Sequence, residues 1–142
     1  MILPDTNLLV FAVNKDAPDH AEAAKWLRAV LGGTETVAIL SCVAFSFVRI
    51  VTNPRIFPRP FSTGEAFRYV ENWLQFASAL WVDSAYDDFV AAEKLLAVAK
   101  GAGGNLVSDA QIAAAAQRLD ATIHSMDSDF ARFPNVKWHN PL

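Results

Sequence analysis

Short apolar segments alternate with longer amphipathic segments along the whole chain of 142 residues. This alternation constrains the fold more than any other feature, because it is typical of α/β domains with a mainly parallel sheet. The predicted strands are 2–5, 37–40, 79–82, 121–124 and a short one around 136–138. The predicted helices are 8–13, 20–31, 42–51, 62–76, a segment from 84 or 87 to about 100, and 109–119, with a loop at 101–104. No repeat or linker interrupts the pattern, so we expect a single domain over residues 1–142.

Several of these helices are preceded by residues that can cap a helix N-terminus. We expect Asp19, Ser41 and Ser108 to cap the helices that follow them. Ser62 is followed three residues later by Glu65, which is the spacing of a capping box.

The composition excludes several classes of protein. Apolar residues make up 53% and charged residues 19%, which is typical of a compact globule rather than a disordered chain. A net charge of −3 argues against a protein that coats nucleic acid by bulk charge. Cys42 is the only cysteine, so we expect a small buried residue and neither an intramolecular disulfide nor a thiolate metal cluster. No apolar stretch reaches the roughly 18 residues of a membrane span, so we expect a soluble cytoplasmic protein without a membrane partner.

Acidic residues stand at the expected edges of strands and helices. Asp5 ends the first strand, Asp109 lies in the first turn of a helix, and Asp127 follows the strand 121–124, with Asp129 two residues on. Because the carboxyl ends of parallel strands lie on one edge of a sheet, these carboxylates are expected to converge. Converging carboxylates share protons or bind a hard cation, and oxygen-only ligands favour Mg²⁺ or Mn²⁺. Such a site favours phosphoryl-transfer chemistry, in which the metal activates water and neutralises charge on the phosphate.

Three of these acids also have a purely structural interpretation. Asp109 could be a charge that the helix macrodipole favours at a helix N-terminus. Asp127 and Asp129 could cap the short turn at Phe130. Asp5 is harder to explain in this way, because apolar residues flank it on a strand that we expect to be buried.

A basic stretch lies between Thr36 and Gly64, where the chain has no Asp or Glu but has Arg49, Arg55 and Arg59. Together with nearby phenylalanines, these arginines could form a groove in which cations meet phosphates and rings stack on RNA bases. Alternatively, the phenylalanines pack in the core and the arginines are merely solvated.

Three segments together resemble a known family: Asp5-Thr6-Asn7, Ser108-Asp109-Ala110, and 125–130 (SMDSDF). They are similar to the PIN domain and, more closely, to the VapC toxins of type II toxin–antitoxin systems. The run 49–57 (RIVTNPRIF) and the ending from Phe133 to Pro141 also match a VapC subgroup, so the resemblance covers nearly the whole chain. It implies a three-layer α/β/α sandwich and a Mg²⁺- or Mn²⁺-dependent endoribonuclease. It also implies a cognate VapB-type antitoxin, which could lay an apolar helix on this domain, and a homodimer.

The resemblance assigns roles to individual residues. Asp5, Asp109 and Asp127 would be metal ligands, directly or through water, and Asp129 would assist them. Asn7 and Ser125 would orient carboxylates or water.

One position departs from the family pattern. The family usually has a glutamate three residues before an arginine such as Arg49, and this chain has Ser46 there. A serine hydroxyl carries no charge, although it could bind a metal-coordinated water; it could also be a small packing residue. We therefore expect weaker cation affinity and one bound metal rather than two.

The sequence thus predicts a metal-dependent endoribonuclease toxin. The alternative is a catalytically silent or weak PIN-like module that binds RNA or protein, which Ser46 and the net charge of −3 would favour. A third class, a metal-dependent phosphatase for small substrates, would be indifferent to RNA.

Overall fold

The computed structural model describes residues 1–99 and 103–142. Its elements, in chain order, are β1 (Ile2–Pro4), α1 (Thr6–Val13), α2 (His20–Leu31), β2 (Val37–Leu40), α3 (Ser41–Val51), α4 (Thr63–Trp73), β3 (Ala79–Val82), α5 (Tyr86–Ala99), α6 (Leu106–Leu119), β4 (Thr122–His124), the 3-10 helix η1 (Ser128–Arg132) and β5 (Lys137–His139). The predicted alternation of strands and helices is confirmed.

The strands form one five-stranded sheet in the order β3-β2-β1-β4-β5, and each of these neighbouring pairs is parallel. The central strand is β1, in which Pro4 lies opposite His124 of β4. Asp5 therefore leaves the middle of the sheet at its carboxyl edge, and its backbone N–H donates to the carbonyl of His124 at 2.9 Å. This edge is where open α/β sheets place ligand groups.

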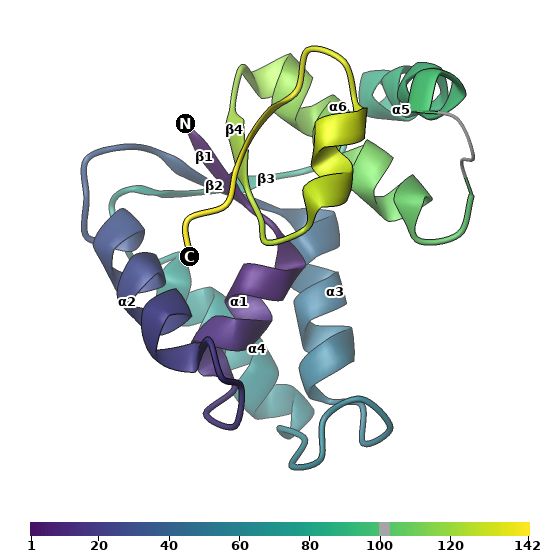
Figure 1. Ribbon diagram of the computed structural model, residues 1–142. Coiled ribbons are helices and arrows are strands. Elements are labelled where there is room, and N and C mark those ends of the chain that lie inside the picture. Colours follow the sequence, from purple (N-terminus) through teal and green to yellow (C-terminus); the bar gives the residue numbers. More distant parts are fainter. Residues whose placement is uncertain (100–102) are drawn as a thin grey trace.

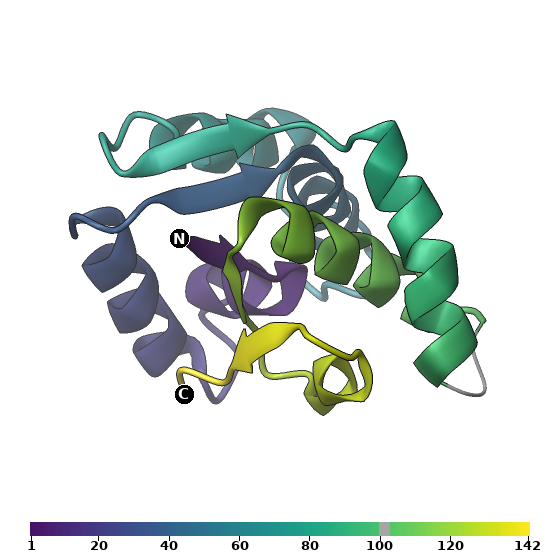
Figure 2. The same ribbon diagram turned by 90° about the horizontal axis from the view of Figure 1, so that it is seen from above.

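Helices cover both faces of the sheet. In Figure 1, α1, α2, α3 and α4 lie on one side and α5 and α6 on the other, which is the predicted three-layer α/β/α arrangement. Seen from above, α5 packs beside α6 at one end of the sheet (Figure 2). Leu3, Ile39 and Ile123 in the three inner strands have no exposed surface, as expected for a parallel sheet covered on both faces. Within the described part of the chain, no helix is long and apolar enough to cross a membrane.

The capping predictions have mixed outcomes. The capping box is confirmed, because Ser62 Oγ accepts from the Glu65 amide at 3.2 Å and Glu65 Oε2 accepts from the Ser62 amide at 2.8 Å. Asp19 occupies the N-cap position of α2, but its side chain makes no capping hydrogen bond. The prediction for Ser41 was wrong, because this residue is the first of α3 and Leu40 precedes it.

The beginning of α6 also differs from the prediction. The helix starts at Leu106 rather than Asp109, so Ser108 lies inside the first turn and does not cap it. Leu106 is buried, and this burial favours an additional turn that the polar residues did not indicate. The predicted end of α5 at about residue 100 and the first half of the loop 101–104 lie outside the described residues. Gly104 has a φ of 57°, which favours glycine at this turn.

The end of α4 is earlier than predicted. The helix stops at Trp73, three residues before the predicted end at Phe76. The following residues form hydrogen-bonded turns instead, in which the Phe76 amide donates to the Trp73 carbonyl at 3.2 Å. These turns lead directly into β3.

Candidate active site at the carboxyl edge of the sheet

Asp5 joins the end of β1 to the beginning of α1. Its Oδ1 accepts a hydrogen bond from the Thr6 amide and its Oδ2 accepts one from the Ser125 hydroxyl, both at 2.6 Å. The residue is only 6% exposed. Burial raises the pKa of Asp5 above its ordinary value, although the hydrogen bonds from Ser125 and Thr6 act in the opposite direction. The sequence prediction of a costly, buried carboxylate is therefore confirmed.

Ser125 connects three parts of this edge. Its single hydroxyl proton goes to Asp5, so Oγ can only accept from its other neighbours. These donors are Asn7 Nδ2 at 3.0 Å and the Asp127 amide at 2.9 Å. Among the described residues, the Oδ1 atom of Asn7 is buried and has no hydrogen-bond partner. Such an atom is costly to leave alone and is suited to accept from a bound water.

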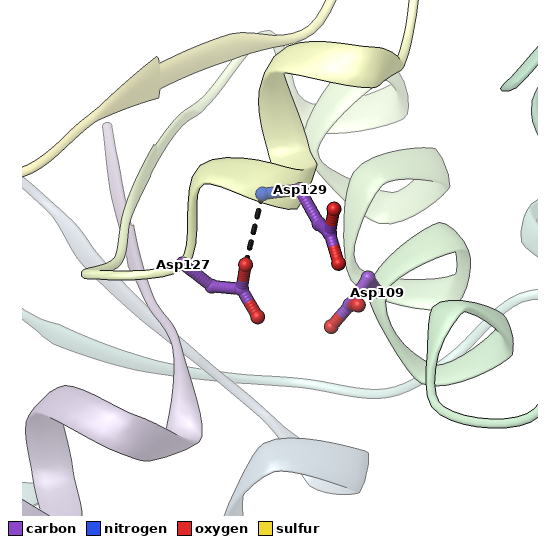
Figure 3. A group of neighbouring side chains, drawn as sticks. All are labelled: Asp109, Asp127 and Asp129. Atoms are coloured by element: carbon purple, nitrogen blue, oxygen red, sulfur yellow. Dashed lines mark hydrogen bonds between the residues drawn. The ribbon is translucent and has the colours of Figure 1, made fainter.

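Three more carboxylates gather beside this network. Oxygens of Asp109, Asp127 and Asp129 lie within 4.8 Å of one another (Figure 3). Asp109 comes from the first turn of α6, whereas Asp127 and Asp129 come from the beginning of η1. Asp127 Oδ1 accepts from the Asp129 amide at 2.8 Å, and this hydrogen bond stabilises the beginning of η1. Asp129 also pairs with Arg132 at 3.3 Å.

The cluster carries unfavourable negative charge. The pKa of Asp109 is raised to about 6, first by burial and then by the charges of Asp127, Asp5 and Asp129. The same charges would favour a bound cation. With carboxylate oxygens as the donors, the preferred cation is a hard one such as Mg²⁺ or Mn²⁺.

A cavity of about 380 Å³ opens onto these acids. Asp5, Asp109 and Asp127 line it. Residues of α1, α3 and α6 also line it, among them Val10, Phe11, Ser46, Arg49, Ile50 and Ile112. The lining of the cavity thus combines three acids with apolar side chains and one arginine.

The predicted site residues are only partly brought together. Asp5, Asn7, Ser46, Asp109 and Asp127 all line the cavity. Ser125 is fully buried behind them, and Asp129 joins the carboxylate cluster from the side.

The three predicted arginines separate. Arg49 lines the cavity, but Arg55 and Arg59 lie in the loop after α3 and are not part of its lining. Arg59 forms an ion pair with Asp16 at 2.5 Å. Phe57 is 6% exposed, so this ring packs in the core rather than against a nucleic acid.

Sequence reasoning missed the apolar wall of the cavity and Gln111, which also lines it. The apolar pattern of α1 was visible, but nothing in it distinguished a cavity wall from the core. Cys42 lies on the same wall instead of being a fully buried filler. Burial raises the pKa of its thiol, so it stays protonated and is a poor metal ligand.

Comparison with known proteins agrees with this geometry. The model of the PIN domain family matches residues 2–136. Ribonuclease VapC33 of Mycobacterium tuberculosis is 35% identical, with 100% of this chain and 99% of that protein covered. Ribonuclease VapC37 of the same organism is 36% identical, with 99% and 97% covered. The chain therefore belongs to the PIN domain family, in its VapC branch.

Solved structures share the fold. VapC20 of Mycobacterium tuberculosis, a toxin that cleaves the sarcin–ricin loop, superposes with a TM-score of 0.70 at 15% identity, covering 96% of this chain and 99% of that one. VapBC2 of Rickettsia felis, bound to a DNA fragment from its promoter, gives 0.68 at 22% identity, covering 99% and 98%.

Proposed function

We propose that this chain is a metal-dependent endoribonuclease, the toxin of a toxin–antitoxin pair. The observation that carries the proposal is the group of carboxylates around one cavity, where burial first and the neighbouring negative charges second raise the pKa of Asp109 to about 6. Full-length relatives at 35–36% identity named as VapC ribonucleases support the choice of RNA as substrate. Such an enzyme would act in the cytoplasm, where its substrate is.

The residues of the site fit a divalent cation. Asp109, Asp127 and Asp129 would hold it, with Asp5 adjacent, and all the donors are oxygens, as Mg²⁺ and Mn²⁺ require. When bound, the ion supplies an activated water and neutralises charge on the scissile phosphate. The unpartnered Oδ1 of Asn7 supports the same interpretation, because it can orient a water beside the acids.

Other groups of the chain would bind and orient the RNA. Arg49 lines the cavity and can pair with a phosphate that approaches the acids. Val10, Phe11 and Ile50 provide apolar surface that excludes bulk water from one side. Arg55 and Arg59 remain candidates only for RNA that extends beyond the cavity.

Incubation of the purified chain with RNA tests the proposal. Cleavage is expected in Mg²⁺ or Mn²⁺ and should stop on addition of EDTA. Asp127→Asn should be inactive although its amide oxygen can still accept from Asp129. Cleavage by Asp127→Asn at the parental rate would refute the assignment, and hydrolysis of simple phosphate esters without RNA cleavage would indicate the phosphatase instead.

A second candidate function is a silent binding module, because the cavity wall carries Ser46 where a further acid would strengthen cation binding. Calorimetric titration with Mn²⁺ separates the two. No binding at millimolar Mn²⁺ would favour the module.

Ser46→Glu is expected to increase Mn²⁺ affinity, because it adds a carboxylate to the lining of the cavity that the acids share. An increase of about tenfold, or a second binding event, would be visible by calorimetry. Thr63→Glu, at the exposed beginning of α4, is a matched control for the added charge and should leave affinity unchanged. An equal response of both variants would show that only net charge matters.

The proposed silencing partner is a VapB-type antitoxin. Helix α3 offers it two adjacent surfaces, since Arg49 lines the acidic cavity while Phe45 and Val48 line an apolar groove of about 140 Å³ with Phe67 and Trp81. One antitoxin segment could place an apolar side chain in the groove and a cationic one among the acids. The cation would then compensate the carboxylates in place of the metal.

The proposed homodimer would use the outer face of α5 and the beginning of α6. Tyr86 is 79% exposed and Phe89 75%, and Phe89 lines a hollow of about 720 Å³ together with Leu96 and Val107. Large exposed apolar surface of this kind marks interaction sites. Acidic neighbours on α5, Asp87 among them, disfavour a nucleic acid there and leave a second copy as the better occupant.

Phe89→Glu is therefore expected to convert a dimer into a monomer, because it places a charge in the centre of this apolar face. Light scattering at tens of micromolar protein measures the change. Phe76→Glu, at a ring that is 45% exposed beyond α4, is the control and should remain dimeric. A parental chain that is already monomeric would contradict the proposed interface.

A further inference from the structure

The backbone of Ser125 is held by β5. Its N–H donates to the carbonyl of His139 at 3.1 Å, and its own carbonyl accepts from the indole Nε1–H of Trp138 at 3.0 Å. Trp138 is half-buried, whereas its neighbours Lys137 and His139 are exposed. The indole is thus the inward-facing anchor of a three-residue edge strand.

The contacts of Ser125 transmit this restraint to the acids. Its hydroxyl donates to Asp5 and accepts from Asn7 and from the Asp127 amide. With the two backbone contacts, every polar group of Ser125 is engaged. A shift of this residue would therefore move its hydrogen bonds to Asp5, Asn7 and Asp127 together. Displacing the carboxylates by a fraction of an ångström is enough to weaken metal binding.

We propose that Trp138 is a positioning residue, whose indole N–H fixes Ser125 and thereby the relative placement of Asp5 and Asp127. This role concerns the same site as the proposed ribonuclease and rests on that function where metal binding is concerned. The competing explanation is that Trp138 only packs against the core, to which its ring is adjacent. The two differ in what removal of the N–H, without removal of the aromatic ring, should do.

Trp138→Phe makes that change. The first expected result is faster hydrogen exchange at the Asp127 amide, about three- to tenfold, since its acceptor Ser125 is no longer fixed. The second is Mn²⁺ binding weakened by a similar factor in calorimetry. Exchange at amides in the inner strands, such as that of Ile39, should be unchanged.

Trp81→Phe is a matched control. Trp81 also donates through Nε1, to Asp83 Oδ1 at 2.9 Å, but it lies on the opposite edge strand β3. This variant should leave both the Asp127 amide and Mn²⁺ affinity as in the parent.

A double variant tests the route through Ser125. Ser125→Ala alone should weaken Mn²⁺ binding, and adding Trp138→Phe should cause little further loss, because the hydroxyl that contacts Asp5 is already gone. Additive losses would overturn the proposed route. Unaltered exchange at Asp127 in Trp138→Phe, an equal effect of Trp81→Phe, or global unfolding of Trp138→Phe would each overturn the proposal in favour of simple packing. If the parent binds no Mn²⁺ at all, the proposed ribonuclease fails, but the exchange measurement still decides the role of Trp138.

Discussion

Asp109→Asn is expected to slow RNA cleavage strongly and at the same time to stabilise the fold. The carboxylate of Asp109 is one of three that converge within 4.8 Å, so its loss should reduce the rate by about 100- to 1000-fold, as for other groups that stabilise developing charge. Burial and the negative charges of Asp127, Asp5 and Asp129 make the ionised form of this carboxylate unfavourable in the folded protein. An amide of the same shape removes that repulsion.

The direction of the stability change, and the pH range over which it appears, follow from the pKa of Asp109. This pKa is about 6 in the folded protein and about 3.8 in the unfolded chain. Between these values the folded protein binds more protons, so its stability falls as the pH rises through this range and levels off above about 6. At pH 7.5 without metal, Asp109→Asn should therefore be more stable by about 1–3 kcal/mol. Near pH 4 the advantage should be nearly gone.

Thermal unfolding in EDTA at several pH values, combined with an RNA cleavage assay, checks both effects. Asp19→Asn is a suitable control, because it removes one negative charge from the N-cap of α2, where the side chain makes no capping bond. Asp19→Asn should change neither RNA cleavage nor the pH dependence of thermal stability. A less stable Asp109→Asn at pH 7.5 would show that the carboxylates do not repel one another as inferred.

The strands of this fold could be predicted closely because they are short apolar runs between polar breakers. Segments 37–40 and 79–82 coincide with β2 and β3. The convergence of Asp5, Asp109 and Asp127 could also be predicted from the sequence, because a parallel sheet brings the carboxyl ends of its strands to one edge. Helix beginnings were less predictable where burial decided them, as Leu106 shows in α6.

Distances within the site could not be predicted. Nothing in the sequence indicated that Asp129 would join Asp109 and Asp127 more closely than Asp5 does, because Asp5 uses its oxygens on Thr6 and Ser125. That distinction depends on how η1 turns after β4. Contacts between distant segments, such as the indole of Trp138 on Ser125, likewise depend on which side chains meet across neighbouring strands, and a single sequence does not specify them.

Arg118→Met is expected to produce the largest loss of stability. Asp88 of α5 is 2% exposed, and its two oxygens accept from Arg118 of α6 at 2.7 and 2.9 Å. Burial alone would raise the pKa of Asp88, but the hydrogen bonds from Arg118 and the Ala85 amide outweigh it, so the pKa is lowered. Removing the arginine leaves a buried charge with one remaining backbone donor, which costs about 3 kcal/mol.

The pH dependence of this variant distinguishes a lost charge pair from lost packing. In the parent, the lowered pKa means that the pair contributes stability above the unfolded value of about 3.8, and this contribution is lost as the pH falls through the lower folded value. In Arg118→Met, Asp88 can be protonated more readily, so the loss relative to the parent should be greatest at pH 7 and smaller near pH 4. Urea denaturation at both pH values measures it.

Asp88→Asn combined with Arg118→Met should recover part of the loss, because no uncompensated charge remains in the interface between α5 and α6. Arg28→Met, at an exposed position in the last turn of α2, should change stability by no more than about 0.5 kcal/mol. A double variant no more stable than Arg118→Met would mean that the aliphatic stem of Arg118 matters more than its charge. Because α6 also carries Asp109, the charge pair that fixes α5 against α6 holds one side of the acidic site in place. RNA cleavage should therefore fall with stability in Arg118→Met but not in Arg28→Met.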